Sequence, residues 1–288
     1  MIIASFPETA EIGKKVAQAL KAHYTTIDVK SFPDSEFHLK LHENPNHNAV
    51  VILNSLSGEP NRKIIETILA GGVARDYHAK KVILVATYLP YMRQDKHFEK
   101  YDSFSAKHVM KLFDEFDKII AIDPHLHRIH KMSELYSKAE SISTNGLIAD
   151  YIKKKFKGDF EIIGPDSESR QWDAKIAKML GKKVVILDKT RLGDEEIVQK
   201  EKPLGNIKNA IMIDDIISTG RTLAGAIEMA KNQGAKKITC IGVHGVLVNG
   251  ADELITRNAS LVTTNTIFNK YAEIDVSPII IEALKKVK

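Results

Sequence analysis

Short apolar runs alternate with segments of helical spacing along the whole chain. Runs of four to six apolar residues, such as Val82–Ala86, Phe160–Ile163 and Ala210–Ile213, are separated by polar turns and helical segments. This alternation predicts βαβ units and a parallel sheet that is buried on both faces. Ligands bind beyond the carboxyl ends of the strands in such sheets, so the residues just after each run are the candidates for chemistry.

The second half of the chain repeats the first at an offset of about 160 residues. The matches are Ile2 and Ile3 with Ile162 and Ile163, Lys15, Ala17 and Leu20 with Lys175, Ala177 and Leu180, and Asp28 with Asp188. After a slip of one residue, Asn48–Asn54 matches Asn209–Asp215, and Ala79–Ile83 matches Ala235–Thr239. We therefore expect two similar α/β domains, residues 1–145 and 146–288, and allow for the last residues packing back onto the first domain.

Composition and charge narrow the class of protein. The 288 residues are 43% hydrophobic, which excludes a disordered or fibrous chain, and the single cysteine, Cys240, excludes a disulfide framework. No apolar run approaches the roughly 20 residues that cross a bilayer, and the first residues lack signal-peptide features. We expect a cytoplasmic protein with no membrane partner. The net charge of +5 suits anionic ligands, but the absence of an RNA-binding signature argues against a nucleic-acid partner.

The segment Ile211–Thr222 carries the strongest chemical pattern. An apolar strand ends in Asp214 and Asp215, and a short Ser/Thr/Gly loop then opens a helix. The N-terminus of a helix offers unpaired N–H groups to a phosphate, and a glycine such as Gly220 can wrap an anion. The carboxylates can accept hydrogen bonds from sugar hydroxyls or hold Mg²⁺. A helix cap beside two solvated aspartates is the alternative. The dinucleotide fingerprint, the Walker A loop and H-E-x-x-H are absent from the sequence.

The pattern Asp214-Asp215-x-x-Ser-Thr-Gly-x-Thr222 resembles the ribose-phosphate loop of type I phosphoribosyltransferases. Over its whole length the chain resembles the ribose-phosphate pyrophosphokinases, or PRPP synthetases, and its compactness is compatible with their archaeal type. The resemblance implies two tandem phosphoribosyltransferase-type domains of α/β fold. It also implies transfer of the β,γ-diphosphoryl group of Mg-ATP to the 1-hydroxyl of ribose 5-phosphate. The residues implied in binding ribose 5-phosphate are Arg191, Asp214, Asp215, Ser218, Thr219, Gly220, Arg221 and Thr222.

Two segments of the first domain resemble the family's ATP-binding segments. Phe32-Pro-Asp-Ser-Glu36 is similar to its F-x-D-G-E loop, which reaches the ATP site of a neighbouring subunit; an ordinary Pro-Asp-Ser turn is the alternative. The resemblance implies ATP contacts from Phe32, Asp34, Ser35 and Glu36, and a homodimer or higher homo-oligomer. Arg93-Gln94-Asp95 resembles the family's R-Q-D signature, and Arg93 offers a fork of donors to the ATP phosphates. A surface Arg–Asp pair is the alternative there.

The implied metal site rests on residues that follow two other strands. Asp123-Pro-His125 resembles the family's D-L-H motif, in which the histidine helps to place Mg-ATP, and Gly164-Pro-Asp166 resembles its P-D turn. The metal ligands implied are therefore His125, Asp166 and Asp123, with Mg²⁺ as the cofactor. His127 and His130 make the histidine cluster denser than the motif requires, and a zinc site on His125, His127 and Asp123 is the alternative.

Lys189 and Arg191 follow the strand Val184–Leu187 and open a long loop of mixed charge. They resemble the family's K-x-R pair on a flexible catalytic loop. Phosphoryl transfer depends on positioning and electrostatic stabilisation, so cations on a closing loop suit the reaction. Two exposed bases without a role are the alternative.

The resemblance divides labour between the domains, with ATP on the first, ribose 5-phosphate on the second, and the catalytic site at their junction. Two other functions remain open. A plain phosphoribosyltransferase would consume PRPP and would need only one copy of the domain. A non-catalytic, synthetase-like regulatory subunit should have lost catalytic positions, whereas Lys189, Arg191, His125 and Asp215 are all present.

Overall fold

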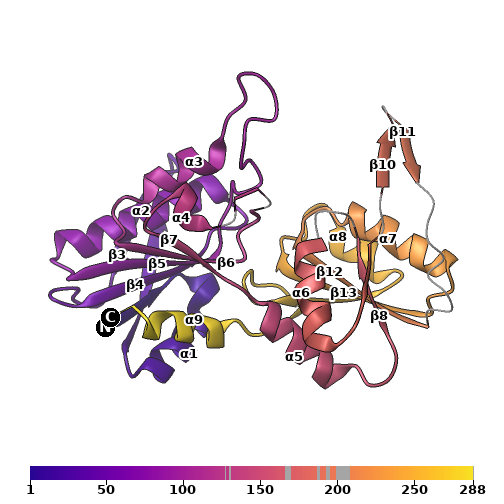
Figure 1. Ribbon diagram of the computed structural model, residues 1–288. Helices are drawn as coiled ribbons and strands as arrows, with labels where there is room; N and C mark the ends of the chain where they lie inside the picture. The colour runs from indigo at the N-terminus through magenta and orange to yellow at the C-terminus, as the bar shows by residue number, and fades with distance from the viewer. Residues whose placement is uncertain are drawn as a thin grey trace. The chain divides into compact units, whose positions relative to one another are not determined.

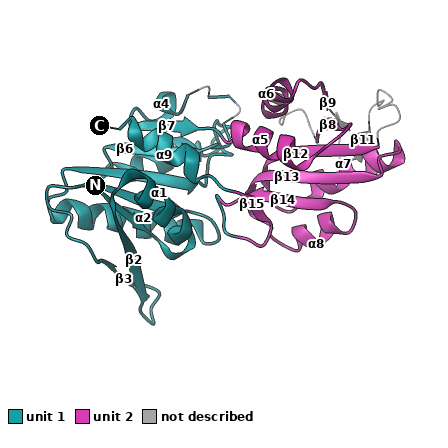
Figure 2. Ribbon diagram, turned by 90° about the horizontal axis from the view of Figure 1, so that it is seen from below, with its two compact units in different colours: residues 1–143, 266–268, 275–288 teal, residues 144–265, 269–274 magenta. Residues whose placement is uncertain are grey.

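The structure is a computed structural model, which describes residues 1–126, 128–129, 131–165, 170–186, 189–192, 195–198 and 208–287. The chain forms two compact units (Figure 2). Unit 1 consists of residues 1–143, 266–268 and 275–288, and unit 2 of residues 144–265 and 269–274. The first division lies two residues before the expected boundary at residue 145.

Unit 1 contains a seven-stranded sheet in the order β3-β2-β1-β4-β5-β6-β7 (Figure 1). All neighbouring strands are parallel except the edge hairpin β2–β3, which is antiparallel. The strands are β1 (Ile2–Ser5), β2 (His23–Ser31), β3 (Phe37–Leu41), β4 (Ala49–Ser55), β5 (Lys81–Tyr88), β6 (Lys118–Ile122) and β7 (Ala139–Ile142). The helices are η1 (Pro7–Thr9), α1 (Ala10–Leu20), α2 (Pro60–Asp76), α3 (Ser105–Met110), η2 (Lys111–Phe113), α4 (Met132–Leu135) and α9 (Ser277–Lys285).

The C-terminal helix α9 belongs to unit 1, although the chain enters it from unit 2. It packs against α1, and Lys15 Nζ lies 2.8 Å from Asp275 Oδ2 just before the helix. Residues 266–268 also belong to unit 1. Hydrogen bonds tie them to the sheet, because the hydroxyls of Ser55 and Thr87 both donate to the Thr266 carbonyl, at 2.8 and 2.7 Å.

Unit 2 contains a six-stranded parallel sheet in the order β15-β14-β13-β12-β8-β9. Its strands are β8 (Glu161–Gly164), β9 (Val184–Ile186), β12 (Asn209–Ile217), β13 (Lys237–Gly245), β14 (Ser260–Thr264) and β15 (Ala272–Ile274). Its helices are α5 (Asn145–Lys155), α6 (Arg170–Leu180), α7 (Arg221–Asn232) and α8 (Ala251–Thr256). The backbones of β10 (Lys189–Leu192) and β11 (Glu195–Val198) pair as a separate antiparallel hairpin.

Helices cover both faces of each sheet, which is why the apolar runs are continuous. In unit 2, Ile211 and Ile213 pack with apolar residues of α5 and α6, whereas Met212 packs with those of α7 and α8. Successive side chains of a strand point to opposite faces, so a strand covered on both sides needs apolar residues at every position. The predicted α/β class, with two similar and mainly parallel sheets flanked by helices, is confirmed.

The strand order also confirms the repeat, since β2-β1-β4-β5-β6-β7 in unit 1 corresponds to β9-β8-β12-β13-β14-β15 in unit 2. The ladders fix which residues correspond. Ala49 lies opposite Lys81 in unit 1, and Asn209 lies opposite Lys237 in unit 2. The adjoining backbone bonds agree, because the Lys80 N–H donates to the Asn48 carbonyl and the Lys236 N–H donates to the Lys208 carbonyl.

The covered faces agree with this register, because Val50 and Ile52 pack with residues of α2, the helix after β4, as Ala210 and Met212 pack with residues of α7, the helix after β12. The residue matching expected for β4 and β12 is therefore wrong by one position. Asn54 corresponds to Asp214. Ser55 follows Asn54 as Asp215 follows Asp214, although the β4–β5 ladder shifts by one residue between Asn54 and Ser55.

The matching of the first strands, β1 and β8, is wrong by one position as well. Ile3 lies opposite Val51, and Ile162 lies opposite Ile211. Because Val51 corresponds to Ile211, the counterpart of Ile162 is Ile3 and not Ile2. A shift of one residue exchanges the two faces of a strand, and a run of four similar apolar residues cannot by itself fix the register.

No helix within the described residues is both long and apolar enough to cross a membrane.

Candidate functional site

The loop between β12 and α7 is held in one conformation by its surroundings. The Leu247 N–H donates to the Ile217 carbonyl at 3.0 Å, and the Val248 N–H donates to the Ser218 carbonyl at 3.1 Å. Gly220 has φ +71°, and a Cβ there would lie 3.2 Å from the Ala251 carbonyl oxygen. Only glycine meets both conditions without strain. The loop therefore leads into the N-terminus of the 12-residue helix α7, where the first N–H groups have no partner within the helix.

The loop brings four polar residues to the start of α7. Thr219 and Arg221 are exposed, and Ser218 and Thr222 are half-buried. Hydroxyl groups and helix N–H groups close together can bind an anion such as a phosphate. The strand–loop–helix backbone expected around Ser218–Thr222 is therefore present, and the binding of a phosphate there stays a prediction.

The two aspartates before the loop lie on opposite faces of β12. By the alternation of the strand, Asp214 lies on the face covered by α7 and α8, and Asp215 on the face covered by α5 and α6. Asp214 shares this face with Cys240, and burial, followed by the negative charge of Asp214, raises the pKa of the Cys240 thiol. Asp215 is 7% exposed and Asp214 is half-buried. The two carboxylates thus lie on opposite faces and do not form a side-by-side dyad. The strand does not end at them as expected, because β12 continues to Ile217.

In unit 1, the Arg93–Asp95 segment follows β5 and has two of its three residues held in place. The Ala106 N–H donates to the Gln94 carbonyl at 3.2 Å, and the Ser105 hydroxyl donates to Gln94 Oε1. The side chain of Asp95 is 1% exposed and accepts from Arg128. Arg93 is exposed and has no ion pair with any residue that the structure describes. Arg93 and Gln94 are therefore both exposed, with Gln94 held by the start of α3, whereas Asp95 is buried.

The Asp123–His125 turn follows β6, the strand next to β5. Asp123 is buried, has φ +33°, and donates its backbone N–H to the Ile142 carbonyl at 3.0 Å. A left-handed conformation in a residue other than glycine is strained, and such strain is common in functional loops. His125 is half-buried. The turn thus brings a carboxylate and an imidazole to the carboxyl edge of the unit 1 sheet.

The Phe32–Glu36 loop is the tip of the edge hairpin β2–β3, which extends from unit 1 (Figure 2). All five residues are exposed, and the Phe32 side chain is 47% exposed. The tip is closed by the Phe32 N–H, which donates to the Glu36 carbonyl at 2.7 Å. Ser35 has φ +75°, so the serine takes the left-handed conformation that a glycine adopts without strain.

Several expected site residues fall outside the described structure. These are Asp166, proposed as a metal ligand, and His127 and His130 of the histidine cluster. The backbones of Lys189 and Arg191 form the first and third positions of β10, and their side chains are not described. Among the described residues, no group of three His, Cys, Asp or Glu side chains could hold a metal ion.

Arg128 is a site residue that the motifs did not reveal. It binds Asp95 from 33 positions away in the sequence. In the sequence, Arg128 is marked only as a cation three residues after His125. Its pairing with Asp95 depends on β5 and β6 being neighbours in the sheet.

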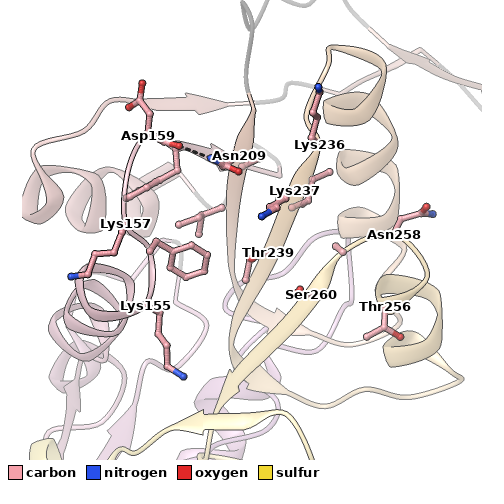
Figure 3. A pocket seen from close by; sticks show the side chains of 16 residues that line it. Lys155, Lys157, Asp159, Asn209, Lys236, Lys237, Thr239, Thr256, Asn258 and Ser260 are labelled. Carbon is pink, nitrogen blue, oxygen red and sulfur yellow. Dashed lines mark hydrogen bonds between the residues drawn. The ribbon is translucent and has the colours of Figure 1, made fainter.

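A pocket of about 660 Å³ lies at the opposite edge of the unit 2 sheet (Figure 3). It is lined by the first residues of three strands, among them Asn209, Lys237 and Ser260. Two of its charged residues are paired, since Lys155 Nζ lies 3.4 Å from Glu273 and Asp159 lies 2.8 Å from Lys182. The pocket is thus separated by the length of the strands from the loop at Gly220.

Known proteins resemble the chain over both units. Residues 1–116 match the family model of the N-terminal domain of ribose phosphate pyrophosphokinase, and residues 132–276 match that of the phosphoribosyl transferase domain. A ribose-phosphate pyrophosphokinase of Methanopyrus kandleri is 27% identical over 290 residues, covering 99% of each chain. One of Thermoplasma volcanium is 29% identical and covers 96% of each chain.

The fold has a solved counterpart in the phosphoribosylpyrophosphate synthetase of Mycobacterium smegmatis. That structure superposes with a TM-score of 0.86 at 22% identity and covers 100% of this chain and 98% of its own. The second family model alone covers half of the chain, and the first covers most of unit 1. With both units matched, and with relatives that align from end to end, the chain belongs to the ribose-phosphate pyrophosphokinase family.

Proposed function

We propose that this protein transfers the β,γ-diphosphoryl group of ATP to the 1-hydroxyl of ribose 5-phosphate, which gives PRPP and AMP. The observation that carries the proposal is the divergence of two matching units at the carboxyl edges of their sheets. Unit 2 has a phosphate-type loop preceded by two aspartates, and unit 1 has an exposed arginine and an Asp-Pro-His turn on adjacent strands.

Ribose 5-phosphate is proposed to bind unit 2, with its phosphate on Ser218–Thr222 and its hydroxyls near Asp215. The fixed backbone around Gly220 supports this assignment, because a loop that is already ordered does not lose conformational freedom when it binds. Asp214, on the other face of β12, is proposed to accept a second sugar hydroxyl.

Mg-ATP is proposed to bind unit 1, with its phosphates on Arg93 and Gln94. A planar guanidinium that carries no competing ion pair among the described residues can form two parallel bonds to a phosphate. Asp95 holds this segment through Arg128, so we assign it a positioning role within the ATP site.

The residues of this chain fit Mg²⁺ better than zinc. Asp123 supplies a hard oxygen donor beside His125, and Mg²⁺ commonly takes only one or two carboxylates because it keeps several waters and phosphate oxygens. Asp166 is proposed as a further ligand. Bound there, the ion would neutralise part of the negative charge of the phosphates.

Lys189 and Arg191 are proposed to stabilise the charge on the migrating diphosphoryl group. The two cations lie at the start of β10, in the unit that carries the ribose-phosphate loop. Electrostatic stabilisation is the main contribution that a protein makes to phosphoryl transfer.

The test is AMP formation by the purified protein, supplied with ATP, ribose 5-phosphate and Mg²⁺ and followed by chromatography. The proposal expects AMP and PRPP in equal amounts, and no AMP when ribose 5-phosphate is omitted or the metal is chelated. A phosphoribosyltransferase would release no AMP here and would instead consume added PRPP with a base. A regulatory subunit would show neither reaction.

We also propose that the protein acts as a homodimer or higher homo-oligomer, in which the Phe32 loop completes the ATP site of a neighbouring copy. The exposed Phe32 and the projecting hairpin support this. The test mixes Phe32→Ala with Arg93→Ala subunits after separate purification. If each variant is inactive, shared sites should restore roughly one quarter of wild-type activity, because half of the dimers are mixed and each has one intact site. Sites within one chain would restore none.

A further inference from the structure

Asp95 is a buried carboxylate whose two oxygens are bound by one residue. The Arg128 Nη1 donates to Asp95 Oδ1 at 2.9 Å, and the Arg128 backbone N–H donates to Oδ2 at 3.2 Å. The side chain of Asp95 is 1% exposed, whereas that of Arg128 is 42% exposed. A buried carboxylate that loses its partner keeps the cost of desolvation, so this contact matters more than an ion pair on the surface.

Arg128 also contacts an aromatic ring of the same loop. Its guanidinium carbon lies 5.4 Å from the centroid of the Phe98 ring, within the distance of a cation–π contact. One arginine therefore touches the loop that follows β5 at two points, Asp95 and Phe98. A lysine has no planar fork and would reproduce this only in part.

The two loops joined by Arg128 carry the residues proposed for ATP. Arg93 lies two positions before Asp95, and His125 lies three positions before Arg128. The loops follow β5 and β6, which are neighbours in the unit 1 sheet. Gln94 is held separately by the start of α3. The Asp95–Arg128 contact is thus a direct side-chain link between the Arg93 loop and the His125 loop.

We infer that Arg128 is a positioning residue, which fixes the Arg93 loop relative to the His125 loop so that both meet the phosphates of one Mg-ATP. The inference rests on the proposed function for its ligand. It assigns to Arg128 no contact with the substrate.

The test compares Arg128→Ala, Arg128→Lys and Asp95→Asn with the wild type. Arg128→Ala should raise the KM for ATP roughly 10–100-fold, as expected for a lost hydrogen bond to a charged group, and should leave the KM for ribose 5-phosphate within about twofold. Arg128→Lys should give an intermediate KM for ATP. A double variant that combines Arg128→Ala with Asp95→Asn should have a KM for ATP no higher than that of the more impaired single variant, because both changes break the same contact.

Arg75→Ala is the matched control. Arg75 Nη2 lies 2.9 Å from Asp117 Oδ2, and the residue is part of unit 1 as Arg128 is. Asp117, however, immediately precedes β6, at the amino edge of the sheet, whereas Arg128 acts at the carboxyl edge. Arg75→Ala should leave both KM values unchanged, with at most a small loss of stability.

Direct binding of Mg-ATP, measured by calorimetry on the folded proteins, separates this inference from the proposed function. If the wild type binds Mg-ATP and Arg128→Ala binds it at least about tenfold more weakly, the inference stands even if no AMP is formed. If the two bind equally, or if both KM values rise together, Arg128 does not position the ATP loops. Should Arg128→Ala fail to fold, Arg128→Lys decides instead: weaker binding of Mg-ATP than by the wild type supports the inference, and equal binding contradicts it.

Discussion

The two units use the same strand order but place different chemistry at the end of the same strand. At the end of β4, unit 1 has Asn54 and Ser55, where β12 of unit 2 has Asp214 and Asp215. The two residues of unit 1 make hydrogen bonds within the unit. Asn54 Nδ2 donates to Thr67 Oγ1 at 2.9 Å, and Ser55 Oγ donates to the Thr266 carbonyl at 2.8 Å.

The difference shows that the ends of the strands can diverge while the sheet stays the same. The ladder and the two covered faces fix the central residues of each strand, but a strand end is held by fewer neighbours. In unit 1 this position attaches residues 266–268 to the sheet, and in unit 2 it leads into the loop at Gly220.

The variant with the largest expected effect tests whether diphosphoryl transfer depends on a cation of unit 2. Lys189→Ala should lower kcat about 10²–10³-fold while ATP binding persists, because the lost charge acts on the migrating group. Lys40→Ala, an exposed lysine on the β2–β3 hairpin of unit 1, is the control and should keep normal kcat. Steady-state kinetics and calorimetry measure both, and near-normal turnover of Lys189→Ala would remove the catalytic assignment.

A second experiment gives unit 2 the residue that unit 1 has. Asp215→Ser should raise the KM for ribose 5-phosphate roughly 10–100-fold, as expected when a hydrogen bond to a charged group is lost. Its counterpart, Ser55→Ala, loses the bond to Thr266 and should cost about 1 kcal/mol in the free energy of unfolding without changing that KM. Equal effects of both variants on the KM would mean that the two strand ends have not divided their roles.

A third experiment compares the glycines in the loops that follow β4 and β12. Gly58 (φ +81°) and Gly220 (φ +71°) both have a left-handed conformation, so an alanine at either should cost about 1–2 kcal/mol in stability. Only the new Cβ at Gly220 meets neighbours, whereas nothing lies within 4 Å at Gly58. Gly220→Ala should therefore also raise the KM for ribose 5-phosphate. Urea unfolding and kinetics check both effects, and a matching rise in Gly58→Ala would contradict the assignment of the loop.

The smallest effect concerns the hairpin tip of unit 1. Ser35→Gly should raise the free energy of unfolding by about 0.5–1 kcal/mol, because glycine takes the observed φ of +75° without strain. Ser103→Gly is the control, since Ser103 is exposed and its φ is not positive, and it should slightly lower stability. A loss of stability in Ser35→Gly would show that the tip is not strained.

The architecture could be predicted from the sequence because each strand and helix is indicated by the residues of its own segment. Continuous apolar runs indicate strands buried on both faces, and their repetition indicates two copies of one unit. The residues after β5, β6 and β12 became candidates for the same reason, since a ligand site on a parallel sheet lies just after its strands. The loop at Gly220 has the backbone that its sequence pattern predicted.

Contacts between distant segments could not be predicted in the same way. The partner of Asp95 is 33 residues away, and helix α9 returns to the unit in which the chain began. Each depends on which strands are neighbours in the sheet, and no pattern within one segment carries that information.

The sequence by itself thus determined that there are two related α/β units and which loops are the candidates for their chemistry. Only the tertiary structure decided that Asn54 corresponds to Asp214, and that the two aspartates lie on opposite faces of β12. The physical reason is that burial on both faces requires only that each residue of a strand is apolar. A run of four apolar residues meets this requirement in either of two registers that differ by one residue. The hydrogen bonds between strands set the register, and with it the face on which every side chain lies.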